Sequence, residues 1–368
     1  MNTADLQFNI IYTPGTARYL SLFVPSLLEW MDSRFRLVAN GCDPEEVSHL
    51  QDLCKTDERL EFLMMSQDSM IQHGQALNWL HDRTEGSWFC YMDSDVIATG
   101  PFIEQVAKQL DECDVFSSGL PLWHAPEDTV LPQTFRRMQG SHIWTDDGTC
   151  IGCDYFAIFN NDMLTRVMNE TGIGFETRNW KDIPQNVQSV LKKVKLDKID
   201  YDSGKILTAL LINEGAIIRY EGFDNLKHLG GFSALSGEGD AFIYRGKLDR
   251  IAVDWFGGIF AAPLLWFADN WYGRKRRVAE LNNKENAMLP GAERRILESR
   301  IRKRLNTARY FNVMMSSVLR GNPPPDYPIL GYKPAELRLV AAAEKIRVAI
   351  STHYPDKAQE PQDLTNPA

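Results

Sequence analysis

Residues 88–96 read Trp-Phe-Cys-Tyr-Met-Asp-Ser-Asp-Val, an apolar run that ends in two carboxylates separated by one serine. The apolar part has the length and composition of a buried strand. At the end of a strand the chain leaves the pleat, so Asp93 and Asp95 can turn toward one ion instead of facing opposite sides. Hard cations such as Mg²⁺ or Mn²⁺ prefer oxygen ligands and commonly combine carboxylates with substrate phosphates. The motif predicts a cation site; the competing interpretation is a polar turn in which aspartate serves as a cap.

Strand and helix patterns alternate on both sides of this motif. Such alternation is typical of parallel strands joined by crossover helices, and it predicts an α/β fold. In open parallel sheets ligands bind beyond the carboxyl ends of the strands, which is where the acidic motif falls. The expected strands are 8–12, 35–39, 61–65, 88–92, 155–160 and 216–220, and the expected helices are 20–31, 72–81 and 202–213.

Composition limits the classes of function. The chain has 368 residues, of which 44% are hydrophobic, enough for one large core with an appendage. A net charge of -9 argues against a general nucleic-acid binder, which would normally present a basic face. The first residues do not resemble a signal peptide, and no apolar run reaches the roughly 20 residues of a spanning helix, so we expect a cytoplasmic protein.

The six scattered cysteines favour reduced thiols, and Cys150-x-x-Cys153 alone favours ordinary packing over a zinc site.

A helical segment, His73-Gly74-Gln75-Ala76-Leu77-Asn78, precedes the strand that ends in Asp93-Ser94-Asp95. This arrangement resembles the donor-binding half of GT-A glycosyltransferases, in which such a helix precedes a strand ending in Asp-x-Asp. The resemblance implies a Rossmann-like, mostly parallel sheet flanked by helices. It also implies a metal-dependent enzyme that takes a sugar from a nucleotide-diphosphate donor.

Two segments downstream extend the resemblance. Lys227-His228-Leu229-Gly230 is similar to the His-x-x-Gly segment that often supplies the third metal ligand, although a lone histidine is commonly a structural residue. Asp202-Ser203-Gly204 is similar to the start of the acceptor-side helix of inverting GT-A enzymes, where an acidic pair supplies the catalytic base. Here Tyr201-Asp202 stands in place of that pair, so only Asp202 carries over. Its alternative role is that of a helix N-cap.

The resemblance implies a role for each candidate residue. Asp202 is the candidate catalytic base, and the expected metal, Mn²⁺ or Mg²⁺, would be held by Asp93, Asp95 and His228. The expected donor is a UDP- or GDP-sugar. The residues implied to contact it are Thr13, Pro14, Gly15, Asn40, His73, Asn78, Asp93 and Ser94.

We expect a catalytic domain over 1–240, with nucleotide-sugar binding in about 1–100 and the acceptor side in about 101–240. A helical extension would occupy 241–335, and a C-terminal helix with a polar tail 336–368. Within the extension, 255–277 is rich in aromatic residues and ends in Arg-Lys-Arg-Arg, a combination that suits peripheral contact with the inner face of the cytoplasmic membrane. A packed helix with a solvated charged end explains the same residues equally well.

The predicted function is transfer of a sugar, with inversion, to a hydroxyl of a glycan or lipid-linked acceptor. A retaining enzyme would use the same metal site without a base at Asp202. A sugar nucleotidyltransferase would normally carry a glycine-rich basic loop after its first strand, whereas this chain has Thr13-Pro14-Gly15-Thr16-Ala17-Arg18 there. A glycan-binding protein without activity is the non-enzymatic alternative.

Overall fold

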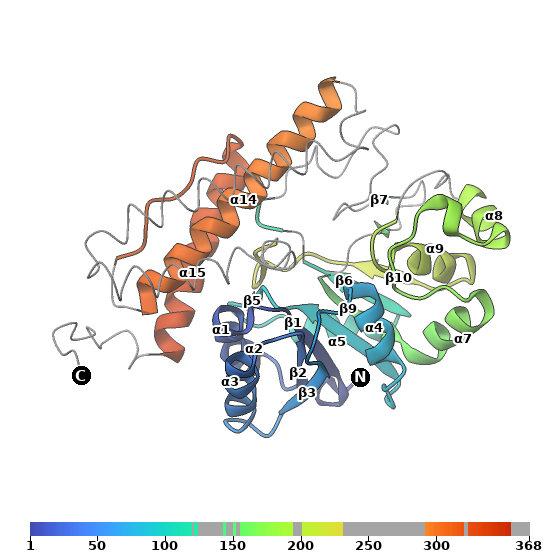
Figure 1. Cartoon of the computed structure of the whole chain (residues 1–368), viewed down its shortest axis with the longest axis horizontal. Helices are drawn as coiled ribbons and strands as arrows, with labels where there is room; N and C mark the ends of the chain where they lie inside the picture. Colours follow the sequence, from blue (N-terminus) through green and yellow to red (C-terminus); the bar gives the residue numbers. More distant parts are fainter. Residues whose placement is uncertain are drawn as a thin grey trace.

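A seven-stranded sheet organises the chain in the computed structural model, which describes residues 1–119, 121–123, 143–144, 150–151, 155–193, 201–230, 291–319 and 323–354 (Figure 1). The strand order is β10-β6-β9-β4-β1-β2-β3, so the strand of the acidic motif lies in the middle. The seven strands are β1 (Gln7–Tyr12), β2 (Arg34–Asn40), β3 (Leu60–Ser66), β4 (Trp88–Asp93), β6 (Val115–Ser118), β9 (Phe156–Asn160) and β10 (Ile218–Tyr220).

Most neighbouring strands run parallel, as the sequence predicts. β1 pairs in parallel with β2 and β4, β2 with β3, and β6 with β10. The exception is β9, which is antiparallel to both β4 and β6. The sequence predicts a strand over 155–160 but does not indicate this reversal of direction. Four of its five residues are buried, and a strand that is apolar on both faces carries no alternation from which its direction could be read.

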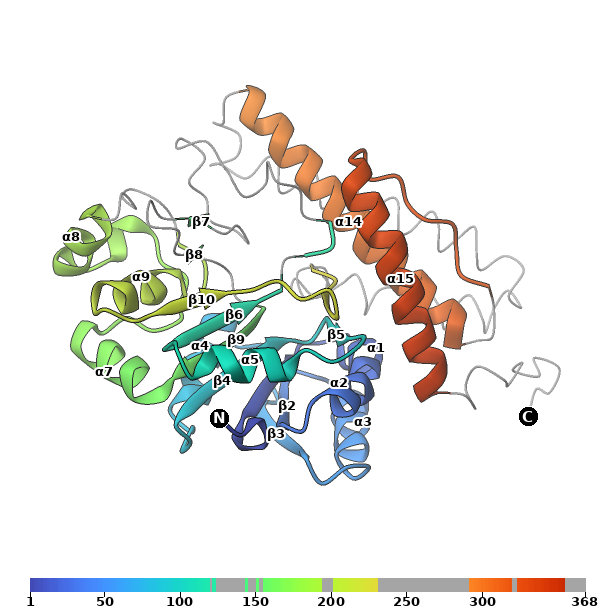
Figure 2. The ribbon, with the colours of Figure 1, turned by 180° about the vertical axis from the view of Figure 1, so that it is seen from behind.

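Helices cover both faces of the sheet and form two hydrophobic cores (Figures 1 and 2). On one face lie α1 (Ala17–Leu20), α2 (Val24–Trp30), α3 (Pro44–Cys54) and α5 (Ile103–Leu110). On the other lie α4 (His73–His81), α7 (Asn161–Thr171), α8 (Gln185–Lys193) and α9 (Lys205–Asn213). The predicted mostly parallel α/β class is confirmed by this arrangement.

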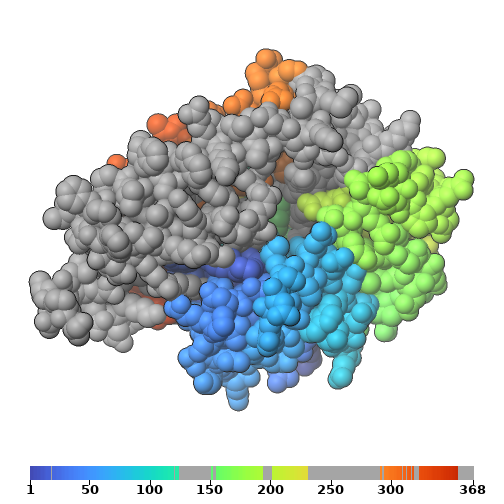
Figure 3. Space-filling view, viewed as in Figure 1, coloured from blue at the N-terminus to red at the C-terminus, as the bar shows by residue number. Residues whose placement is uncertain are grey.

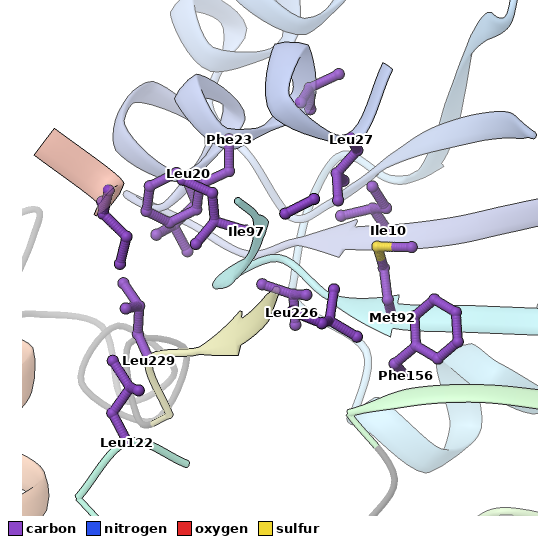
Figure 4. Packing of buried hydrophobic residues seen from close by; sticks show 14 of the residues in the cluster. Ile10, Leu20, Phe23, Leu27, Met92, Ile97, Leu122, Phe156, Leu226 and Leu229 are labelled. Carbon is purple, nitrogen blue, oxygen red and sulfur yellow. The ribbon is translucent and has the colours of Figure 1, made fainter. Parts of the chain in front are cut away.

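The single helix expected over 20–31 is divided. A short 3₁₀ turn, η2 (Ser21–Phe23), separates α1 from α2, and Pro25 lies in the first turn of α2. Proline has no backbone N–H and is tolerated only in the first turn, so a new helix starts there. The apolar spacing survives the break. Figure 4 shows Leu20, Phe23 and Leu27 packed on the side of the sheet that carries Ile10 and Met92.

Smaller elements complete the described fold. An antiparallel pair joins β5 (Val96–Ala98) to β11 (Leu226–His228), and another joins β7 (Ile143–Trp144) to β8 (Cys150–Ile151). The 3₁₀ turns η1 (Thr3–Asp5) and η3 (Trp180–Asp182) are short connectors. The β5–β11 pair matters most for function, because it begins directly after the acidic motif.

Two long helices follow near the C-terminus, α14 (Gly291–Leu319) and α15 (Lys333–His353). Buried residues of α15, including Leu339 and Ile346, join the same hydrophobic cluster as β1, and His353 Nε2 lies 3.1 Å from Glu29 Oε2. The C-terminal helix therefore packs against the α/β unit. None of the described helices is long and apolar enough to cross a membrane. Residues 255–277 and Cys153 lie outside the described residues, so the expectations for them stay predictions.

Candidate metal centre

The local topology brings the acidic motif and the downstream histidine together. β4 ends at Asp93, and the chain passes through Ser94 and Asp95 directly into β5. The antiparallel ladder between β5 and β11 pairs Val96 with His228, and the N–H of Leu229 donates to the carbonyl of Asp95 at 3.0 Å. Backbone pairing therefore places His228 beside the two aspartates.

The three side chains form a compact cluster. Nε2 of His228 lies 3.2 Å from Oδ1 of Asp95 and 3.6 Å from Oδ2 of Asp93. One ligand atom from each residue falls within 4.8 Å of the others, a spacing that allows a shared metal ion. The side chains of His228 and Asp95 are 1% and 2% exposed, whereas that of Asp93 is 21% exposed. Asp93 is therefore the member of the cluster that a solvent-borne ligand reaches first.

Neighbouring groups fix the orientation of the imidazole ring. Nδ1 of His228 lies 2.9 Å from the carbonyl oxygen of Gly119, which assigns the proton to Nδ1 and leaves Nε2 as the ligand atom. The ring of Tyr155 stacks on that of His228 with centroids 3.7 Å apart. Among the described residues, buried Nε2 makes no hydrogen bond of acceptable geometry. An oriented ring with an unsatisfied buried nitrogen is typical of a metal ligand.

Strand direction explains why these groups meet at one edge. β6 runs parallel to β4 because each is antiparallel to β9, so Gly119, just beyond the end of β6, lies at the same edge as Asp93. β9 begins at this edge, and the N–H of Asp93 donates to the carbonyl of Tyr155 at 2.7 Å. The antiparallel direction of β9 therefore brings Tyr155, the residue before this strand, to the site as an aromatic wall.

The electrostatics of the cluster favour a cation. Burial and the adjacent Asp95 charge raise the pKa of Asp93 to about 7, against the opposing effect of His228. Burial alone would lower the pKa of His228, but the charges of Asp95 and Asp93 outweigh it and raise that pKa. Two crowded carboxylates and an imidazole constitute a donor set that fits a divalent ion such as Mn²⁺.

The turn predicted to contact the donor is held by a residue that the sequence analysis did not single out. Glu46, buried at the start of α3, accepts hydrogen bonds from the N–H groups of Gly15 at 3.0 Å and Ala17 at 3.1 Å. Thr16 Oγ1 closes the same turn by accepting from the N–H of Thr13 at 2.9 Å. The turn over Thr13, Pro14 and Gly15 is therefore rigid, and an internal carboxylate occupies its N–H groups.

The other residues predicted to contact the sugar-nucleotide donor differ in burial and in hydrogen bonding. Asn40 exchanges two hydrogen bonds of 2.8 Å with the backbone of Ile71, so its amide holds the segment before α4. His73 is exposed at the first residue of α4, and Ser94 is buried between the two aspartates. Oδ1 of Asn78 accepts from the N–H of Phe175 at 2.8 Å. Whether these residues touch a donor stays a prediction.

Asp202 lies near the cluster but does not cap a helix. α9 begins at Lys205 with Gly204 at the N-cap position, so the alternative role of Asp202 as an N-cap is wrong. Its Oδ1 accepts instead from the N–H of Ser203 at 2.9 Å. Its charge adds, after burial and Asp95, to the raised pKa of Asp93, which places it within electrostatic reach of the metal cluster.

Sequence reasoning missed Tyr155, Gly119 and Glu46. A glutamate three residues after Asp43 is a capping-box signal that could have drawn attention to Glu46, since both capping bonds are present in the structure. Tyr155 and Gly119 carry no local signal, because their roles depend on the direction of β9 and on pairing between distant segments.

The fold and the site together define a class: an α/β protein with a carboxylate and histidine cluster for a cation at the carboxyl edge of its sheet. No protein-family model and no curated protein matches the chain. Among solved structures, it is similar to a mannosyltransferase from Pyrobaculum calidifontis in complex with GDP-Man and Mn²⁺, at 12% identity over 95% of this chain and 87% of the other, with a TM-score of 0.40. It is similar to the galactosyltransferase LgtC in complex with donor and acceptor sugar analogs, at 14% identity over 58% and 73% of the chains, with a TM-score of 0.37. It is also similar to a Bacillus anthracis protein assigned as a glucose-1-phosphate thymidylyltransferase, at 10% identity over 59% and 87%, with a TM-score of 0.35.

Proposed function

We propose that the chain is a GT-A glycosyltransferase that moves a sugar from a nucleotide-diphosphate donor to a hydroxyl of a glycan or lipid-linked acceptor. The observation that carries this proposal is the cluster of Asp93, Asp95 and His228 at the end of the central strand. Its position agrees with the edge at which open α/β sheets bind ligands. The Asp-x-Asp resemblance in the sequence supports the same function.

The proposed metal is Mn²⁺, because two carboxylates with one imidazole suit it better than Mg²⁺, which favours an all-oxygen shell. Asp95 and His228, both buried, would hold the ion, and Asp93 would complete the set on the exposed side. A bound cation would neutralise charge on the departing diphosphate. The protein holds the ring of His228 in a fixed orientation and buries most of the cluster. Electrostatic stabilisation of the diphosphate would be stronger in such a water-excluded site than in bulk water.

Inversion requires a base that takes the proton of the attacking hydroxyl, and we assign this role to Asp202. Its side chain is half-buried and lies within electrostatic reach of both Asp93 and His73. A carboxylate in that position could accept the acceptor proton during in-line displacement. A retaining enzyme would use the same metal cluster and would not need Asp202. The anomeric configuration of the product separates the two mechanisms.

The nucleotidyltransferase alternative is disfavoured by the first turn. Such enzymes normally carry a glycine-rich basic loop after their first strand, and the free N–H groups of a turn can bind an anion. Here the carboxylate of Glu46 already accepts from the N–H groups of Gly15 and Ala17. A phosphate at this turn would meet a buried negative charge. The donor diphosphate would therefore lie at the metal cluster instead.

A thermal-shift screen of the full chain against UDP-, GDP-, CMP- and dTDP-sugars, with and without Mn²⁺, tests the proposal. Binding to the folded state raises the melting temperature by mass action, so one nucleotide should stabilise the protein only when Mn²⁺ is present. The control is D95N, which should lose that shift. Stabilisation by a donor in the absence of any divalent ion, together with cation-independent glycan binding and no turnover, would indicate a glycan-binding protein.

A further inference from the structure

The short segment Gly174-Phe175-Glu176 lies between α4 and the loop that carries Asp202. On one side, the N–H of Phe175 donates to Oδ1 of Asn78 at 2.8 Å. On the other, the carbonyl of Phe175 accepts from the N–H of Gly204 at 3.0 Å. One peptide segment thus links a side chain of α4 to the backbone two residues beyond Asp202. Figures 1 and 2 show α4, α7 and α9, which share one hydrophobic core, and in Figure 3 the blue surface of the α4 region borders the green surface of the region after β9.

The approach of α4 to this segment depends on two glycines. A Cβ at Gly74 would lie 2.3 Å from the carbonyl oxygen of Phe175, and one at Gly174 would lie 2.4 Å from Oδ1 of Asn78. Neither position has space for a side chain. The backbones therefore meet closely enough for the short amide of Asn78 to reach across, and the geometry of this contact is tightly constrained.

The remainder of the segment is anchored at both ends. The ring of Phe175 lies in an aromatic cluster, with centroids 5.5 Å from Phe89 and 5.9 Å from Tyr91. Further on, Arg178 and Tyr201 exchange backbone hydrogen bonds of 3.1 and 2.9 Å. Asp202 directly follows this bridge, and Gly204 follows two residues later. Backbone contacts therefore hold the chain on both sides of Asp202, and the one at Gly204 is made to Phe175.

We infer that Asn78 is a positioning residue: by holding the Phe175 amide it fixes the loop that presents Asp202 to the metal cluster. This inference rests on the proposed function, because it takes Asp202 as the catalytic base. Asn78 itself touches no reacting atom in this role. A displacement of the loop would move the proposed base relative to the acceptor hydroxyl, and catalysis is sensitive to such misplacement.

The test compares N78L, which has similar size but no acceptor, with N78D, which keeps an acceptor oxygen. We expect N78L to lower kcat at least about tenfold with the donor KM within about twofold, and N78D to recover most of the loss. The matched control is N160L, because Oδ1 of Asn160 accepts from the N–H of Met163 at 3.0 Å and Asn160 ends β9 at the edge of the sheet opposite the metal cluster. N160L should lose comparable thermal stability and keep its kcat.

Hydrogen exchange gives a readout that does not depend on catalysis. In N78L the amides of Phe175 and Gly204 should exchange at least about tenfold faster than in the wild-type protein, and in N160L they should not. Unchanged exchange at Gly204 in N78L would overturn the inference, as would faster exchange with an unchanged kcat. If the wild-type protein transfers no sugar from any donor, the proposed function fails, whatever the exchange data show.

Discussion

Oδ1 of Asp95 lies 3.2 Å from Nε2 of His228, because Asp95 directly precedes β5 and His228 pairs with Val96, the first residue of β5. Both side chains are almost completely buried, so each depends on the other and on a cation for compensation. We expect D95N to lower Mn²⁺ affinity at least about 100-fold, because ligand loss should exceed the 10–100-fold cost of changing a residue that only orients a ligand. Isothermal titration with Mn²⁺ measures this. D82N, at an exposed carboxylate, should bind as the wild-type protein does.

The stacking of Tyr155 on His228 leads to a second prediction. Y155A removes the ring that holds the imidazole in place, and we expect about a tenfold loss of Mn²⁺ affinity. Y155F keeps the ring and should stay within about threefold of the wild-type affinity. Equal affinity for Y155A and the wild-type protein would show that the bond from Nδ1 to Gly119 orients the ring without help.

Metal binding should depend on pH around neutrality. The pKa of Asp93 is raised to about 7 by burial and by Asp95, and the pKa of His228 is raised by both carboxylates. Protons therefore compete with the metal below pH 7, and affinity should rise with pH and level off above about pH 8. Below neutrality it should fall at least about tenfold per pH unit. A flat titration from pH 6 to pH 8 would contradict this prediction, and D93N should show a weaker pH dependence.

The same raised pKa values contribute to stability in the metal-free protein. Asp93 titrates near 7 when folded and near 3.8 when unfolded, so its charge increasingly disfavours the folded state as pH rises from about 4 to 7. The raised pKa of His228 acts in the same direction through neutrality, since its favourable protonated form is lost as pH rises. Added Mn²⁺ should reverse this local loss.

Much of this arrangement was predictable from local sequence. The carboxyl end of an apolar strand identified Asp93 and Asp95, and the resemblance of 227–230 to the His-x-x-Gly segment of GT-A enzymes singled out His228, which the structure brings to the same cluster. Turn chemistry located the ends of β1 and β2. The direction of β9 could not be predicted, because both its faces are apolar, and with it the position of Tyr155 was missed.

The hydrogen-bond partners of individual side chains also could not be predicted from the local sequence. Asn40 and Asn78 occupy positions typical of ligand contacts, yet each hydrogen-bonds to a backbone segment that is far from it in the sequence. Such partners are set by tertiary packing, and no periodicity or spacing encodes them. The same holds for the start of α9, where Gly204 and not Asp202 takes the cap position.

The contribution of Glu46 to the stability of the turn after β1 can be measured by substitution. E46A removes an acceptor from the N–H groups of Gly15 and Ala17 and should lower the free energy of unfolding by about 1–3 kcal/mol. Q51A, at an exposed position of the same helix, should change it by less than about 0.5 kcal/mol. Chemical denaturation of both variants measures the difference. Equal stabilities would show that the turn holds its shape without Glu46.

The packing of α15 on the α/β unit is testable with a matched pair of aliphatic residues. Ile346 is fully buried in the cluster that includes β1, whereas Val348 is 49% exposed. I346A should cost about 2–5 kcal/mol of unfolding free energy. V348A should cost less than about 0.5 kcal/mol. Similar effects of the two substitutions would mean that the helix is not part of this core.

The ligands of the metal cluster belong to different sheets, with Asp93 at the end of the seven-stranded sheet and His228 on the two-stranded one. An ion held by both would add a crosslink to the backbone ladder that already joins these segments through β5 and β11. Binding of the ion should therefore change how easily this part of the chain opens to a protease. The strand that carries His228 should resist proteolysis when loaded with Mn²⁺ and become a cleavage site when a chelator removes the ion.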